Sequence, residues 1–210
     1  MSVGLTLDIV STVSGFGPVI AALYNYKHLD KVLKIAAFFF LLASTFDPVM
    51  WLSSQLGAIN NMPLLHLNIL VSLFFYGLLY YHLFLKRALK RASAVFAFIV
   101  FIIMLCYNSN IFEYPSVSNT ALSIMLIVLS LAYFYQLLNP LKYVDIEKQS
   151  FFWINAGVLI YSSVNIFLFM IFTQIPVADR PNYYIINSIT NIIANLLFSV
   201  GLLCKPQKAT

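Results

Sequence analysis

Two carboxylates and one imidazole stand inside long apolar stretches of this chain, where ionisable side chains are rare. They are Asp8, Asp47 and His66. Such groups could bind an ion, carry protons or contact a charged ligand. Together they could also form a metal site, although a zinc enzyme needs three convergent His or carboxylate ligands around an open position. We favour a ligand or ion site, and we predict no metal and no catalytic residues.

Amide side chains form a second set of candidates. Asn187, Asn191 and Asn195 recur at every fourth position, so on a helix they form one stripe. A polar stripe on a helix of lipid length must face protein or trapped water. In the preceding apolar segment lie Asn155 and Asn165. We interpret Asn155 and Asn195 as hydrogen-bonding links between helices, and the other three amides as part of a ligand site.

Other chemistries lack their sequence motifs. A retinal protein needs a Schiff-base lysine in its last helix, and residues 182–204 contain no lysine. The chain also has no serine nucleophile elbow, phosphate-binding glycine loop or nucleotide fingerprint. We therefore expect no cofactor, and an enzyme is the least favoured class.

The composition indicates which elements must position these residues. Of the 210 residues, 61% are hydrophobic and 9% are charged, against roughly a quarter charged in a soluble domain. Apolar runs of about 20 residues can each cross roughly 30 Å of hydrocarbon as a helix. We predict an all-α, polytopic integral membrane protein with one domain over 1–210, no soluble domain and no nucleic-acid partner. Its seven transmembrane helices are expected at about 3–24, 31–54, 62–85, 92–107, 117–138, 150–173 and 182–204.

The basic residues predict the orientation in the membrane. Seven spans place alternate loops on opposite sides, and eleven of the twelve basic residues then fall on one side, with Arg180 alone on the other. Cytoplasmic loops carry the excess of Lys and Arg, so we predict an N-terminus outside and a C-terminus in the cytoplasm. The eleven are Lys27, Lys31, Lys34, Lys86, Arg87, Lys90, Arg91, Lys142, Lys148, Lys205 and Lys208.

Counting along the helices from their outer ends places the polar residues at one level. At 1.5 Å per residue they lie roughly 6 to 12 Å below the outer surface. Leaving each alone in lipid would be costly, so we predict that they line a polar pocket open to the outside. The predicted ligand-binding residues are Asp8, Asp47, His66, Asn165, Asn187 and Asn191.

Two further residues near this level have their own predictions. Pro48 removes a backbone donor directly after Asp47, and we predict a kink there that acts as a hinge. Asn68 lies about 200° around its helix from His66, and we expect it to face a different neighbour. His28 and His82 fall at the inner face, which leaves His66 as the single histidine at pocket depth.

A short internal repeat suggests a transporter as an alternative. The third and seventh segments both open with an asparagine five residues before a polar residue, Asn61 before His66 and Asn182 before Asn187. Two parallel three-helix units joined by a fourth helix would explain the echo, as in sugar transporters of the SWEET type. The proline-glutamine motif typical of those proteins is absent, because Pro18 is followed by Val19 and Pro140 by Leu141.

The sixth segment carries a resemblance to a known group. The string FFWINAGVLIYSS at 151–163, with the amide-rich segment after it, resembles uncharacterised seven-helix proteins of the bacterial inner membrane, which are similar to the membrane sensor halves of some histidine kinases. The resemblance implies an outer ligand pocket coupled by helix movement to a cytoplasmic partner. Only Lys205 to Thr210 follow Cys204, so we expect output through a separate protein.

These observations favour a sensor or receptor-like protein of the bacterial inner membrane. It is expected to bind a small ligand or ion in the outer pocket and to act through a separate cytoplasmic or membrane partner. Two alternatives remain open: a small-solute or ion transporter of SWEET-like 3+1+3 architecture, and a structural subunit of a membrane complex.

Overall fold

The computed structural model describes residues 3–57, 60–107, 110–138, 145–176 and 180–204, and within these ranges it contains helices and no strands. Seven spans are long and apolar enough to cross a membrane, as the sequence predicted. The long helices are α1 (Val3–Ser14), α2 (Phe16–Tyr24), α3 (Lys31–Gln55), α4 (Met62–Leu83), α5 (Arg87–Tyr107), α6 (Ser116–Leu137), α7 (Ser150–Ile171) and α8 (Arg180–Leu203). Short 3-10 turns lie at η1 (Tyr26–His28), η2 (Ile146–Lys148) and η3 (Phe172–Gln174).

The first span is interrupted, whereas the sequence predicted one helix over 3–24. Pro18 has no N–H group, so the carbonyl of Ser14 loses its usual helical partner. Three residues before Pro18, the backbone N–H of Gly15 is shared between Ser11 O at 3.3 Å and Thr12 O at 3.2 Å. The span therefore consists of α1 and α2, which meet at Gly15.

The fourth span begins earlier than predicted. Apolarity alone placed its start at 92, but α5 begins at Arg87, and the N–H of Lys90 already bonds to Lys86 O at 3.1 Å. Lys and Arg are good helix formers, and their long side chains can reach water from the end of a membrane helix. The basic residues therefore belong to the first turns of α5. Pro48 lies inside α3, which continues without a break to Gln55; its action as a hinge stays a prediction.

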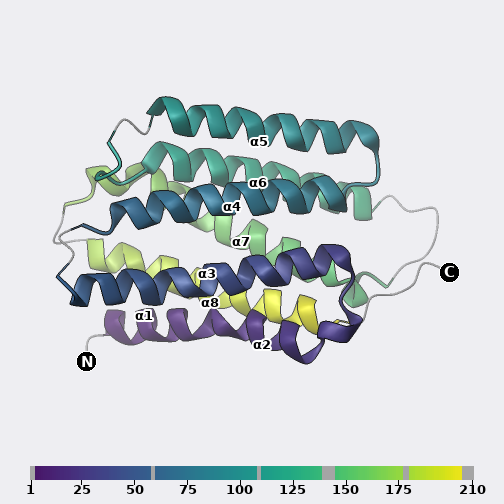
Figure 1. Cartoon of the computed structure of the whole chain (residues 1–210), viewed down its shortest axis with the longest axis horizontal. Coiled ribbons are helices and arrows are strands. Elements are labelled where there is room, and N and C mark those ends of the chain that lie inside the picture. The colour runs from purple at the N-terminus through teal and green to yellow at the C-terminus, as the bar shows by residue number, and fades with distance from the viewer. Residues whose placement is uncertain (1–2, 58–59, 108–109, 139–144, 177–179, 205–210) are drawn as a thin grey trace.

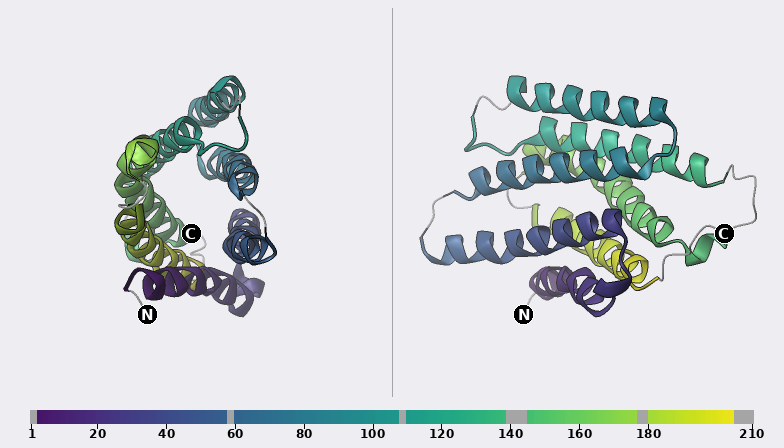
Figure 2. Two further views of the ribbon diagram at one scale, coloured as in Figure 1. Left: turned by 90° about the vertical axis from the view of Figure 1, so that its left-hand side faces the viewer. Right: turned by 45° about the vertical axis from the view of Figure 1, so that its right-hand side comes forward.

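Consecutive spans lie side by side, and the last span returns to the first. α8 packs against α7 on one side and against α1 and α2 on the other, while α4 also contacts α6 directly. Figure 2 shows this ring in its end-on view, with α5 at the outside of the bundle. α5 is also the least buried of the seven spans. The contacts follow chain order and give no support for two separate three-helix units.

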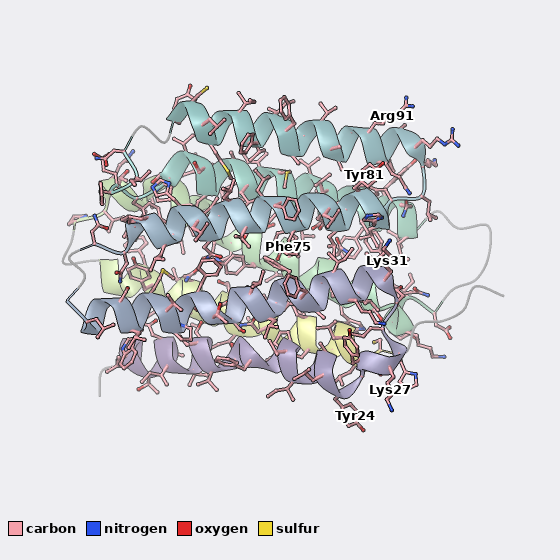
Figure 3. All side chains as sticks on the ribbon, in the orientation of Figure 1. Tyr24, Lys27, Lys31, Phe75, Tyr81 and Arg91 are labelled. Atoms are coloured by element: carbon pink, nitrogen blue, oxygen red, sulfur yellow. The ribbon has the colours of Figure 1, made fainter. Side chains whose placement is uncertain are left out.

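Most of the basic residues that the structure describes lie at one end of the bundle, and Arg180 begins α8 at the other. α1 begins at one end and α8 finishes at the other (Figure 1). Lys27, Lys31 and Arg91 lie at the end where α8 finishes, together with Tyr24 and Tyr81 (Figure 3). We call this the basic end, and the other the N-terminal end. Lys142, Lys205 and Lys208 lie outside the described residues.

Glycines let α7 and α8 approach closely. A Cβ atom on Gly201 would lie 2.7 Å from the carbonyl oxygen of Ser150, and one on Gly157 would lie 2.6 Å from the ring of Phe198. Both distances are shorter than real Cβ contacts, so the two backbones meet directly at Gly201, and the ring of Phe198 lies against the α7 backbone at Gly157. This seam fixes the position of α8, which carries the amide stripe.

The end of α8 is held by its neighbours at the basic end. The amide of Asn25, which directly follows α2, donates to Leu202 O at 2.8 Å and to Cys204 O at 3.4 Å. Ser150, at the start of α7, donates its hydroxyl to the same Cys204 carbonyl at 3.3 Å. These bonds satisfy carbonyl groups that every helix leaves unpaired at its C-terminus.

A polar network joins three helices inside the half of the bundle nearer the basic end. The hydroxyl of Tyr80 on α4 donates to Asn155 Oδ1 on α7 at 2.7 Å, and it lies 2.7 Å from Ser130 Oγ on α6. Asn155 also donates to Phe151 O at 2.8 Å. All three side chains of the network are fully buried. The prediction that Asn155 links helices is thus confirmed.

Candidate functional site

A cavity of about 530 Å³ lies between the spans. Side chains from α1, α3, α4, α6, α7 and α8 line it, so every span except α5 contributes. This volume lies within the range of sites for small molecules. The bundle therefore has room for a ligand among its polar residues.

Four of the six predicted site residues line this cavity. Asp8 comes from α1, Asp47 from α3, and Asn187 and Asn191 from α8. Residues at the two ends of the sequence are thus brought together, because α8 packs directly against α1. Whether they bind a ligand stays a prediction.

The other two predicted residues lie elsewhere. The Nε2 atom of His66 lies 3.0 Å from the backbone oxygen of Glu113, beside the cavity rather than in it. Asn165 is fully buried and donates to Thr190 Oγ1 on α8 at 2.7 Å and to Tyr161 O at 3.0 Å. It holds α7 to α8 behind the cavity wall.

Asn68 takes the place that the sequence analysis gave to His66. It lies on the opposite side of α4 from His66, as the helical angle predicted, but it is Asn68 that lines the cavity. Counting residues from the end of a helix gives depth, and it leaves open which side faces inward.

The amide stripe of α8 forms a ladder of hydrogen bonds with α1. Asn191 donates to Ser11 Oγ and Asn195 to Ser14 Oγ, each at 2.9 Å. One step towards the N-terminal end, Ser188 donates to Asp8 Oδ1 at 2.6 Å. The prediction that Asn195 links helices is confirmed. The same ladder fixes the direction of the Asp8 carboxylate.

Asn187 continues the stripe towards α7 instead of α1. The hydroxyl of Tyr161 donates to Asn187 Oδ1 at 3.3 Å, and both residues line the cavity. The cavity wall is therefore continuous across α7, α8 and α1.

Asp47 differs from the residues around it. In the part of the chain that the structure describes, its carboxylate has no hydrogen-bond or ion-pair partner. The nearest charge that acts on it is the like charge of Asp8. Its side chain is exposed and borders the cavity, and an ionisable residue within a membrane span is a functional candidate.

Aromatic side chains close the cavity towards the basic end. The rings of Phe40 and Phe198 stack with their centroids 4.6 Å apart, and Phe39 meets Tyr76 edge-on at 4.8 Å. All four line the cavity. Behind them lies the Tyr80 network, so two packed layers separate the cavity from the basic end.

Aromatic residues also surround the cavity near the N-terminal end. Phe172 lies between Tyr114 and Tyr184, with ring centroids 4.2 Å and 5.5 Å away. Asn119 donates to the hydroxyl of Tyr114 at 3.4 Å. Burial raises the pKa of the Tyr114 phenol, so this residue stays neutral at physiological pH.

The sequence analysis missed the contribution of α6. Asn119 and Ser123 line the cavity, and a bond from Ser123 Oγ to Asn119 O at 2.8 Å links them along the helix. Their spacing of four residues puts both on one side of a helix, as in the α8 stripe, and could have predicted a polar face on α6. Ser162 on α7 was missed as well: it is 1% exposed and lines the cavity.

The described residues contain no cluster of three His, Cys, Asp or Glu side chains that could hold a metal ion. The polar lining instead consists of two carboxylates, amides and hydroxyl groups. Such a set can donate and accept hydrogen bonds and can balance a positive charge.

Comparison of this chain with known protein families, curated proteins and solved structures found no match. The resemblance to the membrane halves of sensor kinases therefore stays a prediction from the sequence.

Proposed function

We propose that this chain is a receptor-like membrane protein that binds a small ligand in the cavity and acts through a separate partner. The observation that carries the proposal is Asp47, a carboxylate without a partner among the described residues, facing a 530 Å³ cavity. Asn155 and Asn195, which hold helices together, are paired with side chains of neighbouring helices. Asp47 is not paired, which favours binding.

The proposal includes a place and an orientation. The protein is a multi-pass protein of the bacterial inner membrane, with the N-terminal end outside and the basic end in the cytoplasm. The gathering of Lys and Arg at one end supports this orientation, since cytoplasmic loops carry such residues. The cavity would then receive its ligand from the periplasmic side, as an outward-facing pocket.

Labelling with a membrane-impermeant maleimide tests the orientation. In a background lacking Cys106 and Cys204, Ile111→Cys should react in spheroplasts with an intact membrane, whereas Lys148→Cys should react only after the membrane is opened. Ile111 is 50% exposed near the N-terminal end, and the side chain of Lys148 is 60% exposed near the basic end. The reverse pattern would show the opposite orientation.

Signalling requires that occupancy of the cavity changes the basic end. α3 and α8 both line the cavity and both reach that end. Pro48 directly follows Asp47 and is the one proline inside α3. A ligand that binds to the Asp47 carboxylate therefore acts next to the point where α3 lacks a backbone hydrogen bond. We assign the switch to a movement of α3 at Pro48.

Asp47→Asn should raise the stability of the ligand-free protein. The variant removes an unpaired charge and its repulsion from Asp8, so the free energy of unfolding should rise by about 1 kcal/mol. Unfolding in mild detergent at pH 7, followed by tryptophan fluorescence, measures the change. If Asp47 were a structural link, the variant would instead lose stability. Asp145→Asn, at the basic end, is the control and should change stability by less than about 1 kcal/mol.

The partner is tested by purification from the native membrane in mild detergent. Wild-type protein and Asp47→Asn should both retain a signalling protein, identified by mass spectrometry, and the activity of that protein should differ between the two. A monomer that carries no partner would count against the proposal. A partner whose output is the same with Asp47→Asn would favour a structural subunit.

A small-solute or ion transporter is the second candidate. It is favoured by the two carboxylates, Asp8 and Asp47, that line a cavity between the spans. A transporter holds its substrate in such a cavity and opens it alternately to each side. Solute accumulation in proteoliposomes that Asp47→Asn abolishes, without loss of fold, would select this function over the receptor.

A further inference from the structure

The charges around the cavity are of one sign. Among the residues that line it in the described part of the chain, Asp8 and Asp47 are charged, and no Lys, Arg or His is present. Lys27, Lys31 and Arg91 lie at the basic end of the bundle (Figure 3), and Arg180, which begins α8 at the other end, is not among the residues that line the cavity. In a pocket with low-dielectric walls, such a charge pair produces a field that attracts cations.

The two carboxylates have different tasks. Asp8 already accepts a hydrogen bond from Ser188 at 2.6 Å, which holds its direction. Asp47 has no donor among the described residues, so its lone pairs are available to a ligand. A cationic group that donates to Asp47 would also relieve the repulsion between the two carboxylates.

The size and walls of the cavity favour an organic cation over a metal ion. Ca²⁺ or Mg²⁺ needs oxygen ligands that converge at about 2.0 to 2.6 Å. The described residues offer no three-residue acidic or histidine cluster for such an ion, and the cavity is 530 Å³. Aromatic side chains, including Phe39, Tyr76 and Tyr161, line the remaining space. Aromatic faces attract organic ammonium groups and contact an apolar body.

A second, independent feature points to a ligand. The hydroxyl of Ser162 is 1% exposed, lines the cavity and has no hydrogen-bond partner in the described part of the structure. Buried hydroxyl groups are normally hydrogen-bonded, because leaving one unpaired costs about 1 to 3 kcal/mol. A polar group on the ligand would supply the missing bond.

We propose that the ligand is a small organic amine with an apolar or aromatic body. Its ammonium group lies at Asp47 beside Asp8, its body packs against the aromatic wall, and Ser162 bonds to a polar substituent. This inference rests on the proposed function of the cavity, and it specifies the chemical class that the cavity takes.

Three probes of nearly equal shape and different charge test the class. They are 2-phenylethylamine, 2-phenylethanol and phenylacetate, measured by calorimetry with the full chain in nanodiscs at pH 7 and with empty nanodiscs subtracted. The amine should bind at least tenfold more tightly than the alcohol, and phenylacetate should not bind. Asp47→Asn should weaken binding of the amine at least tenfold, while Asp145→Asn, a carboxylate near the basic end, should leave it unchanged.

The outcomes separate this inference from the proposed function. Equal binding of amine and alcohol, or an amine affinity that Asp47→Asn does not change, would overturn the cationic class while leaving a ligand cavity. No binding of the amine would also overturn the class. The receptor proposal is tested separately, by comparing the activity of the partner purified with wild-type protein and with Asp47→Asn. That comparison requires none of these probes.

Discussion

Tyr80→Ala is expected to lower the free energy of unfolding by about 3 to 5 kcal/mol, the range seen when a buried aromatic residue is truncated to alanine. The ring of Tyr80 is fully buried, and its hydroxyl bonds to α6 and α7 at once. The truncation leaves a cavity and two buried polar groups, on Ser130 and Asn155, without their shared partner. Unfolding of the purified protein in detergent, followed by circular dichroism, measures the loss.

Two companion variants separate the ring from the hydroxyl. Tyr80→Phe keeps the ring and should cost about 1 kcal/mol, the usual value of a hydrogen bond between membrane helices. Tyr81→Ala removes the same side chain one position later, where it is 43% exposed, and should have a much smaller effect. A Tyr80→Ala protein as stable as Tyr81→Ala would contradict the network as a support of the bundle.

Gly201→Ala is expected to destabilise the protein by about 2 kcal/mol, although alanine is intrinsically the better helix former. The added methyl group would lie 2.7 Å from Ser150 O, 2.8 Å from Ile154 Cγ1 and 3.3 Å from Ile154 N. Two of these are backbone atoms and cannot turn aside. α7 and α8 would have to separate, as measured by a lower unfolding midpoint in detergent.

Gly4→Ala is the matched control for this substitution. Its added methyl group would meet Ile185 Cγ1 at 3.9 Å, an ordinary contact distance. The variant should be neutral or more stable by up to about 1 kcal/mol, because alanine has the higher helix propensity. Equal effects of the two glycine substitutions would show that the seam between α7 and α8 is looser than described.

The membrane class and the spans could be predicted because they depend on local properties. Apolar length and low charge are sufficient to locate helices that cross a bilayer. The errors arose where another property decides the boundary. The basic residues at the start of α5 are good helix formers despite their charge, and Pro18 breaks the first span by removing one backbone donor.

Four of the six residues predicted for the ligand site line the cavity, and His66 and Asn165 do not. The α8 stripe was readable because its amides repeat every fourth residue, and such a repeat gives a direction as well as a depth. A single residue such as His66 gives depth alone. The direction of α4 is set by its contacts with α3, α5 and α6, which no local pattern records. Asn68 was therefore assigned to another neighbour.

The bonds that Asn25 and Ser150 make to the last carbonyl groups of α8 restrict how this helix can respond to an occupied cavity. With its end tied to α2 and α7 and its glycine seam closed at Gly201, α8 cannot slide along its axis without breaking both. The ladder to α1 and the bond between Asn165 and Thr190 hold the rest of α8 as well, so movement in response to a ligand at Asp47 would fall to α3.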